Sequence, residues 1–402
     1  MKALFLTNEF PPYVYGGAGV HVEYLSRELS KLIDVDVRCF GDQDESKGNL
    51  TVKGFELDKN FVTADAQPNL ASVFDTLAHG MKFNMPVVDA DIVHCHTWYS
   101  HFGGILAKLM YGKKLVVTAH SLEPLRPWKR EQLGGGYEVS SWVEKTALEM
   151  ADCVIAVSKE TKADLMQHFN LDPKKIAMVY NGIDTEQYTK SYSPATLEKF
   201  GIDPNKPFVF FVGRITRQKG IVHLVNAIKH LDEGLQVVLC AGAPDTPEIE
   251  QEMAEAVTKV QASRDGVFWL KDMLDKATAI ELYSAAEVFC CPSIYEPFGI
   301  INLEAMACET AVVASDVGGI KEVVVHDETG LLVPVAQLQE APYEPIHPEN
   351  FSEDLAEAIN KLMRDDARRE RMAKAGRKRA EEVFSWTSIA EQTVEVYKSL
   401  LD

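Results

Sequence analysis

The chain has 402 residues, and its 60 acidic against 41 basic side chains give a formal net charge of −19. This balance argues against a nucleic-acid-binding protein, which needs a basic face to neutralise phosphates, and against docking on anionic lipid. An apolar fraction of 46% and a charged fraction of 25% are typical of soluble globular proteins and exclude disordered and fibrous classes.

The sequence also indicates where the protein resides. No stretch approaches the roughly 18 apolar residues of a membrane span, and the apolar start is too short for a secretion signal. The seven cysteines are scattered and form no C-x-x-C pair, which favours reduced thiols in the core. We therefore expect a cytoplasmic protein of two or three domains that has no membrane partner.

The first half of the chain alternates short apolar runs with amphipathic stretches. Runs at 4–6, 92–93, 115–117 and 154–157 predict buried strands. Between the first two, Val22, Leu25, Leu29 and Leu32 recur at the spacing of one helical face. Strands separated by helices predict a parallel sheet that is covered on both faces.

The same pattern restarts in the second half, with runs at 208–212, 237–239, 267–269, 288–290 and 312–314. The polar, proline-bearing stretch 186–206 is typical of a linker. We predict an α/β protein with two Rossmann-like, doubly wound domains, 1–195 and 196–380, that face a cleft. The segment Ala367–Leu401 predicts helix, and we expect its part 381–402 to pack back on the first domain.

Three motifs follow predicted strands, where parallel sheets bind their ligands. The first is Gly16-Gly17-Ala18-Gly19, before the first helix. Glycines there let the backbone approach an anion at a helix N-terminus. The G-x-G-x-x-G spacing fails because Val22 holds the place of the third glycine, which disfavours a nicotinamide site. A tight turn without a ligand is the alternative.

The second motif is a cationic loop that opens the second half, Gly213-Arg214-Ile215-Thr216-Arg217-Gln218-Lys219-Gly220. Arg214 leaves the strand end and Lys219 precedes the next helix, so both are expected to converge on one diphosphate. Such a clamp stabilises a leaving diphosphate as a metal does elsewhere.

The third motif places two carboxylates eight residues apart, Glu296 at a strand end and Glu304 in the following helix. Carboxylates accept paired hydrogen bonds from vicinal diols, so sugar and ribose hydroxyls are the expected ligands. The backbone amides of Phe298, Gly299 and Ile300 lie between them at the helix start.

Together with Asn181-Gly182-Ile183-Asp184, these motifs resemble the retaining GT-B glycosyltransferases across essentially the whole chain. The segments 9–12, 94–98 and 118–124 are similar to the actinobacterial glycogen synthase and maltose-1-phosphate synthase family. That resemblance implies transfer of α-glucosyl units from ADP-glucose to glucose 1-phosphate or to α-1,4-glucan ends, with retention and without a metal or other cofactor.

The resemblance implies roles for single residues. Arg214 and Lys219 would hold the diphosphate, Glu304 the ribose, and Glu296 with the amides of 298–300 the donor sugar. His120 would sit beside the reacting carbon, and Gly16 and Gly17 would close on the diphosphate. The catalytic set that the resemblance implies is His120, Glu296, Arg214 and Lys219. Larger bacterial glycogen synthases carry Lys-Thr-Gly-Gly at this loop, whereas Val14 and Tyr15 precede the glycines here.

A basic, aromatic segment after a first-domain strand is the expected acceptor site. Its cations would hold an acceptor phosphate and its aromatic rings would stack on glucose. The predicted acceptor residues are His96, Trp98, Arg126, Trp128, Lys129, Arg130 and Tyr137. A structural surface loop is the alternative interpretation.

Other interpretations are less favoured. His94 and His96, which His101 follows, have no nearby third ligand for a metal and are expected to line a cleft or the core. Asp34-x-Asp36 and Asp89-x-Asp91 precede or begin strands instead of following them. An epimerase on the same fold would need no basic, aromatic segment, and a non-catalytic sugar-binding protein would need no diphosphate clamp. The sequence leaves open whether the enzyme uses a different donor or acceptor, and whether the donor nucleotide is ADP or UDP. It also leaves open whether transfer proceeds by front-face attack or double displacement, and whether the protein is a homodimer or a monomer.

Overall fold

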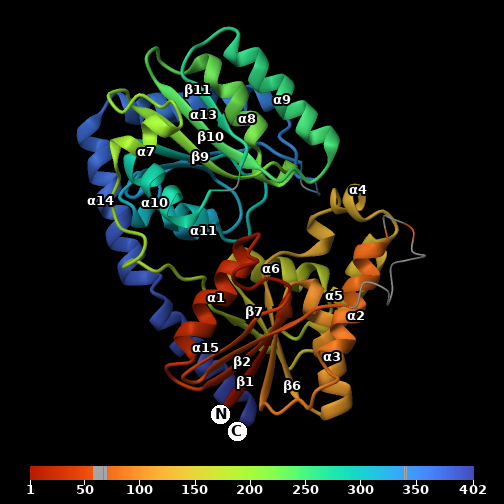
Figure 1. The fold of residues 1–402 in the computed structure, drawn as a ribbon. Helices are drawn as coiled ribbons and strands as arrows, with labels where there is room; N and C mark the ends of the chain where they lie inside the picture. Colours follow the sequence, from red (N-terminus) through yellow and green to blue (C-terminus); the bar gives the residue numbers. More distant parts are fainter. Residues whose placement is uncertain (58–66, 68–69, 273, 339, 341) are drawn as a thin grey trace. The chain divides into compact units, whose positions relative to one another are not determined.

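The computed structural model describes residues 1–402 except 58–66, 68–69, 273, 339 and 341 (Figure 1). The chain forms two compact units. Unit 1 comprises 1–182 and 386–402, and unit 2 comprises 183–385. Across the described ranges, no helix combines the length and apolar character that a membrane span requires.

Unit 1 is built on a sheet with the strand order β3-β4-β2-β1-β5-β6-β7-β8, in which only the β3–β4 pair is antiparallel. Its strands are β1 (Lys2–Leu6), β2 (Asp34–Phe40), β3 (Asp44–Lys47), β4 (Leu50–Phe55), β5 (Ile92–His96), β6 (Lys114–Ala119), β7 (Cys153–Ala156) and β8 (Ile176–Met178).

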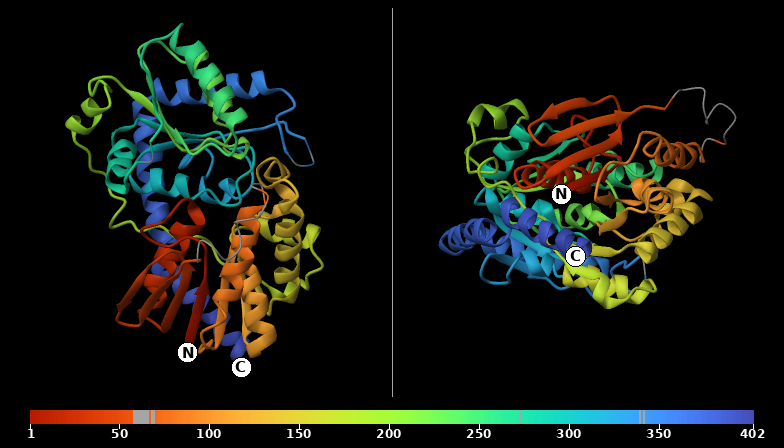
Figure 2. Two further views of the ribbon diagram at one scale, coloured as in Figure 1. Left: turned by 45° about the vertical axis from the view of Figure 1, so that its right-hand side comes forward. Right: turned by 90° about the horizontal axis from the view of Figure 1, so that it is seen from below.

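The helices of unit 1 cover both faces of this sheet (Figure 1). They are α1 (Gly17–Leu29), α2 (Ala71–Lys82), α3 (Trp98–Tyr111), α4 (Lys129–Leu133), α5 (Gly136–Met150), α6 (Lys159–His168) and α15 (Trp386–Leu401), with short 3₁₀ turns at Glu123–Leu125 and Pro173–Lys175. Side chains of α1 and α15 share one apolar core with β1 and β2. The two chain ends consequently lie near one another in this unit (Figure 2).

Unit 2 holds an all-parallel sheet in the order β11-β10-β9-β12-β13-β14. Its strands are β9 (Phe208–Arg214), β10 (Gln236–Gly242), β11 (Val267–Leu270), β12 (Val288–Cys291), β13 (Ala311–Ser315) and β14 (Gly330–Val333). Its helices are α7 (Pro194–Lys199), α8 (Ile221–Ala227), α9 (Pro247–Gln261), α10 (Lys276–Ala285), α11 (Ile300–Ala307), α12 (Ile320–Val323), α13 (Pro348–Met363) and α14 (Asp366–Val383), with 3₁₀ turns at Arg217–Lys219 and Ile228–His230.

The prediction of two Rossmann-like α/β domains is confirmed. Every predicted strand is present, and all of them except the edge strand β11 are apolar runs that a parallel sheet buries on both faces. The apolar runs do not include β2, β3, β4, β8 and β14, which are short or carry polar side chains. The expectation that the two domains face a common cleft stays a prediction.

The C-terminal segment is not the continuous helix that its composition predicts. It breaks at Phe384 and Ser385, between α14 in unit 2 and α15 in unit 1. The Phe384 carbonyl accepts a hydrogen bond from Ile183 N at 2.8 Å, and Ser385 pairs with Ile183 in a parallel bridge. A tertiary pairing therefore ends α14, whereas neither residue is a strong helix breaker. The part that packs in unit 1 begins at Trp386, compared with 381 in the prediction.

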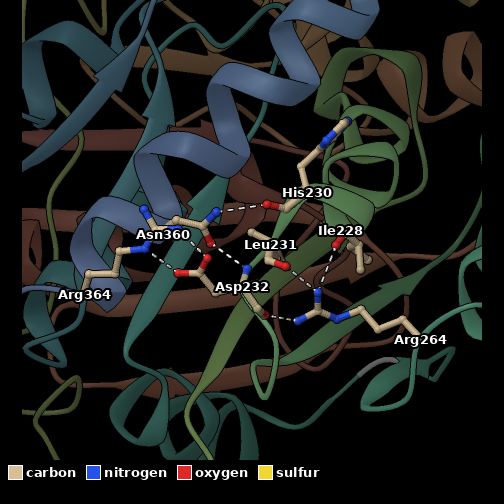
Figure 3. Close-up of polar contacts among 7 residues, drawn as sticks. All are labelled: Ile228, His230, Leu231, Asp232, Arg264, Asn360 and Arg364. Carbon is tan, nitrogen blue, oxygen red and sulfur yellow. Dashed lines mark hydrogen bonds and ion pairs between the residues drawn. The ribbon is translucent and has the colours of Figure 1, made fainter.

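Backbone carbonyls in the turn before β10 are bound by one arginine (Figure 3). The Arg264 guanidinium donates to the carbonyl oxygens of Leu231 at 2.7 Å and Leu235 at 3.0 Å, and also to those of Ile228 and Asp232. From α13, Asn360 donates to the His230 carbonyl at 2.9 Å. Few side chains other than arginine can satisfy so many acceptors at once, so this residue fixes the turn.

We expect Arg264→Met to lower the free energy of unfolding of unit 2 by about 2–4 kcal/mol, because several partly buried carbonyls lose their donor. Urea denaturation at equilibrium measures this change. Arg371→Met, on the exposed side of α14, is the control and should change stability by less than about 0.5 kcal/mol. Equal effects of the two substitutions would contradict the assignment.

Candidate active site

The cationic loop and the carboxylate motif of unit 2 start at one edge of its sheet. Strand β9 ends at Arg214 and strand β12 ends at Cys291, and the two strands are parallel neighbours. The chain continues from β9 to β10 on one side, while β12 lies on the other. This reversal of strand order is a topological switch point, where open α/β sheets bind their ligands.

Lys219 and Glu296 meet at this switch point. Lys219 Nζ donates to Glu296 Oε2 at 2.6 Å, and the side chains are 20% and 9% exposed. Ser293 Oγ donates to the same oxygen at 3.3 Å. Burial lowers the pKa of Lys219, but the attraction of the Glu296 carboxylate outweighs it, and the pKa is raised. Lys219 is therefore a fixed positive charge at neutral pH.

Close backbone contacts hold the Lys219 loop against the segment after β12. Gly220 has a φ of +59°, and a Cβ on it would lie 2.1 Å from the carbonyl oxygen of Pro292. Ile294 N donates to Gln218 O at 3.0 Å. Thr216 Oγ1 accepts from Lys219 N at 3.2 Å and begins the 3₁₀ turn. The glycine that ends the sequence motif is thus required for packing.

A pair of glycines that sequence reasoning missed supports Glu296 from the other side. Gly318 has a φ of +52°, and a Cβ there would lie 2.1 Å from the carbonyl oxygen of Glu296. Gly319 N donates to that oxygen at 2.9 Å. The signal was present, because these glycines follow the apolar run that forms β13, as the other motifs follow their strands.

The second carboxylate, Glu304, is held by two tyrosines. Tyr188 OH donates to Oε1 at 3.0 Å and Tyr283 OH to Oε2 at 2.8 Å. Burial raises the pKa of Glu304, and these two hydrogen bonds offset part of the effect. Gly299, with a φ of +93°, precedes α11 and so positions Glu304 in the second turn of that helix.

Arg214 also pairs with a carboxylate. Its guanidinium forms an ion pair with Asp245, which follows β10 and was not among the predicted residues. The charge of Arg214 opposes the rise in the pKa of Lys219, so the two cations lie in the same region. The edge of the sheet therefore carries two cations, and each has a carboxylate partner.

In unit 1, the predicted glycine loop is closed by Glu9. Glu9 Oε2 accepts from Gly16 N at 2.7 Å and from Tyr15 N at 2.8 Å. Gly17 begins α1, so a carboxylate lies at this helix N-terminus. The loop amides of Tyr15 and Gly16 thus bind a carboxylate of the chain itself, and the predicted contact of this loop with a diphosphate stays a prediction.

Three imidazoles of unit 1 lie together beyond β5 and β6. His96 ends β5, His120 follows β6, and His96 Nδ1 lies 3.0 Å from His120 Nε2. His21 of α1 donates from Nδ1 to Asn181 Oδ1 at 2.6 Å. Burial lowers the pKa of His21 to about 4 and the pKa values of His96 and His120 well below their usual range. All three are neutral at pH 7.

Aromatic members of the predicted acceptor set are packed inside unit 1. Trp98 and Tyr137 share an apolar cluster with Val73 and Leu133 and are 3% and 7% exposed. The Tyr137 hydroxyl donates to the carbonyl oxygen of Glu123 at 2.5 Å. This packing accounts for the presence of both aromatic side chains. It does not support the prediction that they stack on acceptor sugars.

The three cationic side chains of the predicted acceptor site differ in their exposure and in their partners. Arg126 donates to Ser121 Oγ at 3.0 Å, whereas Arg130 is exposed and pairs with Glu138 at 2.6 Å. Lys129 is buried at the start of α4, next to Trp128. Their proposed contact with an acceptor phosphate stays a prediction.

Known proteins match this chain over its whole length. Residues 15–187 match the family described as Glycosyltransferase Family 4, and residues 193–342 match Glycosyl transferases group 1. An alpha-maltose-1-phosphate synthase from Mycolicibacterium smegmatis is 48% identical over 408 residues, which is 100% of both chains. The chain belongs to the GT-B glycosyltransferases.

Solved structures agree with this family. The sucrose-phosphate synthase of Thermosynechococcus elongatus superposes on the glycosyltransferase with a TM-score of 0.77 at 26% identity, covering 100% of this chain and 99% of the other. The HepE protein of Anabaena in complex with UDP-glucose gives a TM-score of 0.76 at 21% identity, covering 99% and 100%, and shows the fold alone.

In this glycosyltransferase, Gly318→Ala should displace Glu296, because the new Cβ would collide with the Glu296 carbonyl. We expect transfer activity to fall by about 10-fold or more, as misplacing a binding group by an ångström does. Initial-rate assays measure the loss.

Gly234→Ala is the matched control for this substitution. Gly234 has a φ of +83°, but nothing lies within 4 Å of its Cβ position. The Gly234→Ala substitution introduces the same backbone strain, about 1 kcal/mol, without the collision. If Gly234→Ala reduced transfer as much as Gly318→Ala, strain alone would explain both and the positioning argument would be wrong.

Proposed function

We propose that this glycosyltransferase transfers α-glucosyl units from ADP-glucose to glucose 1-phosphate, forming maltose 1-phosphate with retention and without a metal cofactor. Ends of α-1,4-glucans are a second proposed acceptor. The observation that carries the proposal is the full-length, 48% identity to the alpha-maltose-1-phosphate synthase of M. smegmatis. The chemistry of the sheet edge in unit 2 supports it.

Arg214 and Lys219 are the proposed ligands of the donor diphosphate. Both lie at the switch point, and the raised pKa of Lys219 keeps it charged. As the bond between glucose C1 and the diphosphate oxygen breaks, negative charge develops on the leaving group. A positioned cation stabilises that charge without reorganisation. Glu304, with its tyrosine hydrogen bonds, would accept hydrogen bonds from the ribose hydroxyls.

Glu296 is proposed to position hydroxyls of the donor sugar, together with the amides of 298–300. Its carboxylate is bound by the Lys219 ammonium at 2.6 Å, which weakens it as a nucleophile toward C1. We therefore favour attack of the acceptor hydroxyl on the face that the diphosphate leaves. The acceptor proton then passes to the departing phosphate oxygen, and ADP is released.

From unit 1, His120 would contact the donor glucose and the loop at Gly16 and Gly17 would bind the diphosphate. The Glu9 contact supports the second role, because the loop amides already bind one anionic group. For the acceptor phosphate, Arg130 is an accessible cation and Arg126 lies four residues before it in the chain.

Acceptor preference is the first test. With ADP-glucose and no added metal, we expect faster turnover with glucose 1-phosphate than with glycogen, and maltose 1-phosphate as the product. Product analysis by mass spectrometry and initial rates with UDP-glucose complete the comparison. Preference for glycogen would identify a chain-elongating enzyme, and transfer to neither acceptor would refute the proposed acceptor class.

Lys219→Ala tests the donor clamp. We expect turnover to fall on the order of 100-fold or more, because the leaving diphosphate loses its positioned cation. Lys229→Ala, which removes an exposed lysine paired with Glu349, should leave turnover unchanged. Undiminished turnover in Lys219→Ala would refute the clamp.

Structural damage needs its own control, because Lys219→Ala leaves the buried Glu296 carboxylate without its cation. The double variant Lys219→Ala/Glu296→Gln removes that unpaired charge. It should recover thermal stability relative to the single variant while turnover stays low. Recovery of turnover along with stability would show that the lysine serves folding alone.

A further inference from the structure

The histidine trio of unit 1, His21, His96 and His120, has the arrangement of a metal site. One ring nitrogen from each residue lies within 4.8 Å of the others. The ring centroids are 4.7 Å apart for His21 and His120 and 5.3 Å for His96 and His120. The sequence analysis disfavoured a metal on a different set, His94, His96 and His101. In the structure, His94 is unsuited as a ligand because its two ring nitrogens bind Tyr397 and Thr118.

The trio leaves two ring nitrogens without hydrogen bonds. His21 and His96 are 2% and 0% exposed, and in the described part of the chain no group hydrogen-bonds their Nε2 atoms. Buried polar atoms of this kind are rare in proteins, and a bound water or ion is one explanation for them. Because Asn181 Oδ1 can only accept, His21 carries its proton on Nδ1, and its Nε2 presents a lone pair.

The spacing of the other two nitrogens fits one tetrahedral ion. His96 Nδ1 and His120 Nε2 are 3.0 Å apart. Two nitrogen ligands at about 2.0–2.1 Å from Zn²⁺ in tetrahedral geometry lie about 3.3 Å apart. With a small shift, an ion can therefore take the place of the proton between these atoms, and that proton moves to the other nitrogen of the same ring. Neutral imidazole is the form that binds Zn²⁺.

We propose that His21, His96 and His120 bind a divalent transition metal ion, Zn²⁺ before others, and that the ion inhibits glycosyl transfer. Three imidazoles leave a fourth position for water, and Asn181 orients His21 as an outer-shell partner. Inhibition is expected because the ion binds Nε2 of His120 and keeps that ring from its role in transfer. This part rests on the proposed function, in which that residue contacts the donor glucose.

Direct binding is the first measurement, and it is independent of activity. Metal-free full-length protein is titrated with ZnCl₂ in the presence of a chromophoric chelator, and we expect one ion per chain. His21→Gln should weaken binding by at least about 10-fold, and Asn181→Ala by about 10-fold. His223→Gln is the matched control, because His223 is also buried with a ring nitrogen that lacks a partner among the described residues, and it packs on Phe351.

Unchanged affinity in His21→Gln, or no stoichiometric binding by the wild type, would overturn the site. Because His21→Gln can fail to fold, Co²⁺ is added to the wild-type protein as a second probe. Intense visible bands of four-coordinate cobalt support the trio as ligands. Weak bands of six-coordinate cobalt refute it.

Transfer assays with ADP-glucose and increasing ZnCl₂ test the inhibition. We expect half-inhibition near the measured dissociation constant, reversal by EDTA, and loss of the Zn²⁺ effect in His21→Gln when each protein is compared with its own metal-free rate. Stoichiometric binding without inhibition would refute the inhibitory role. If no acceptor supports transfer, the proposed function fails, whereas the titration and the cobalt spectrum still decide the metal site.

Discussion

The ion pair between Lys219 and Glu296 is the contact on which the arrangement of unit 2 depends. It joins the loop after β9 to the segment after β12 across the switch point of the sheet. Removing two charges from water is costly, so the pair persists only if its geometry is held closely. Glycines supply that geometry, because Gly220 and Gly318 let backbone carbonyls approach to distances at which a Cβ would collide.

The same edge of the sheet balances its charges before any ligand is present. Glu296 neutralises Lys219 and Asp245 neutralises Arg214, and a protein with a net charge of −19 thereby keeps two cations fixed in one region. A diphosphate bound as proposed would meet cations that are already oriented, and it would compete with the carboxylates for them. Preorganised charges of this kind need no reorganisation during reaction, which is the usual origin of electrostatic catalysis.

Sequence patterns predicted the fold and the strand-end motifs because both follow from local rules. Apolar runs become buried parallel strands, and Lys219 and Glu296 meet because the ends of adjacent parallel strands share an edge. What the patterns missed is tertiary. Asp245 is one acidic residue among many, Trp98 is an aromatic residue that packing buries, and the break at Phe384 comes from pairing with Ile183, which lies 201 residues earlier in the numbering.

The histidine trio is tied to the place where the chain leaves unit 1. Asn181, which sets the proton of His21, directly precedes Gly182, the last residue before the chain enters unit 2. A Cβ on Gly182 would lie 2.5 Å from the indole of Trp386, where the chain returns, and that indole lies 5.3 Å from the His21 ring. A displacement of Asn181 would therefore disturb the hydrogen bond that fixes the His21 tautomer. The chemistry of His21 and the path of the chain between the units are consequently not independent.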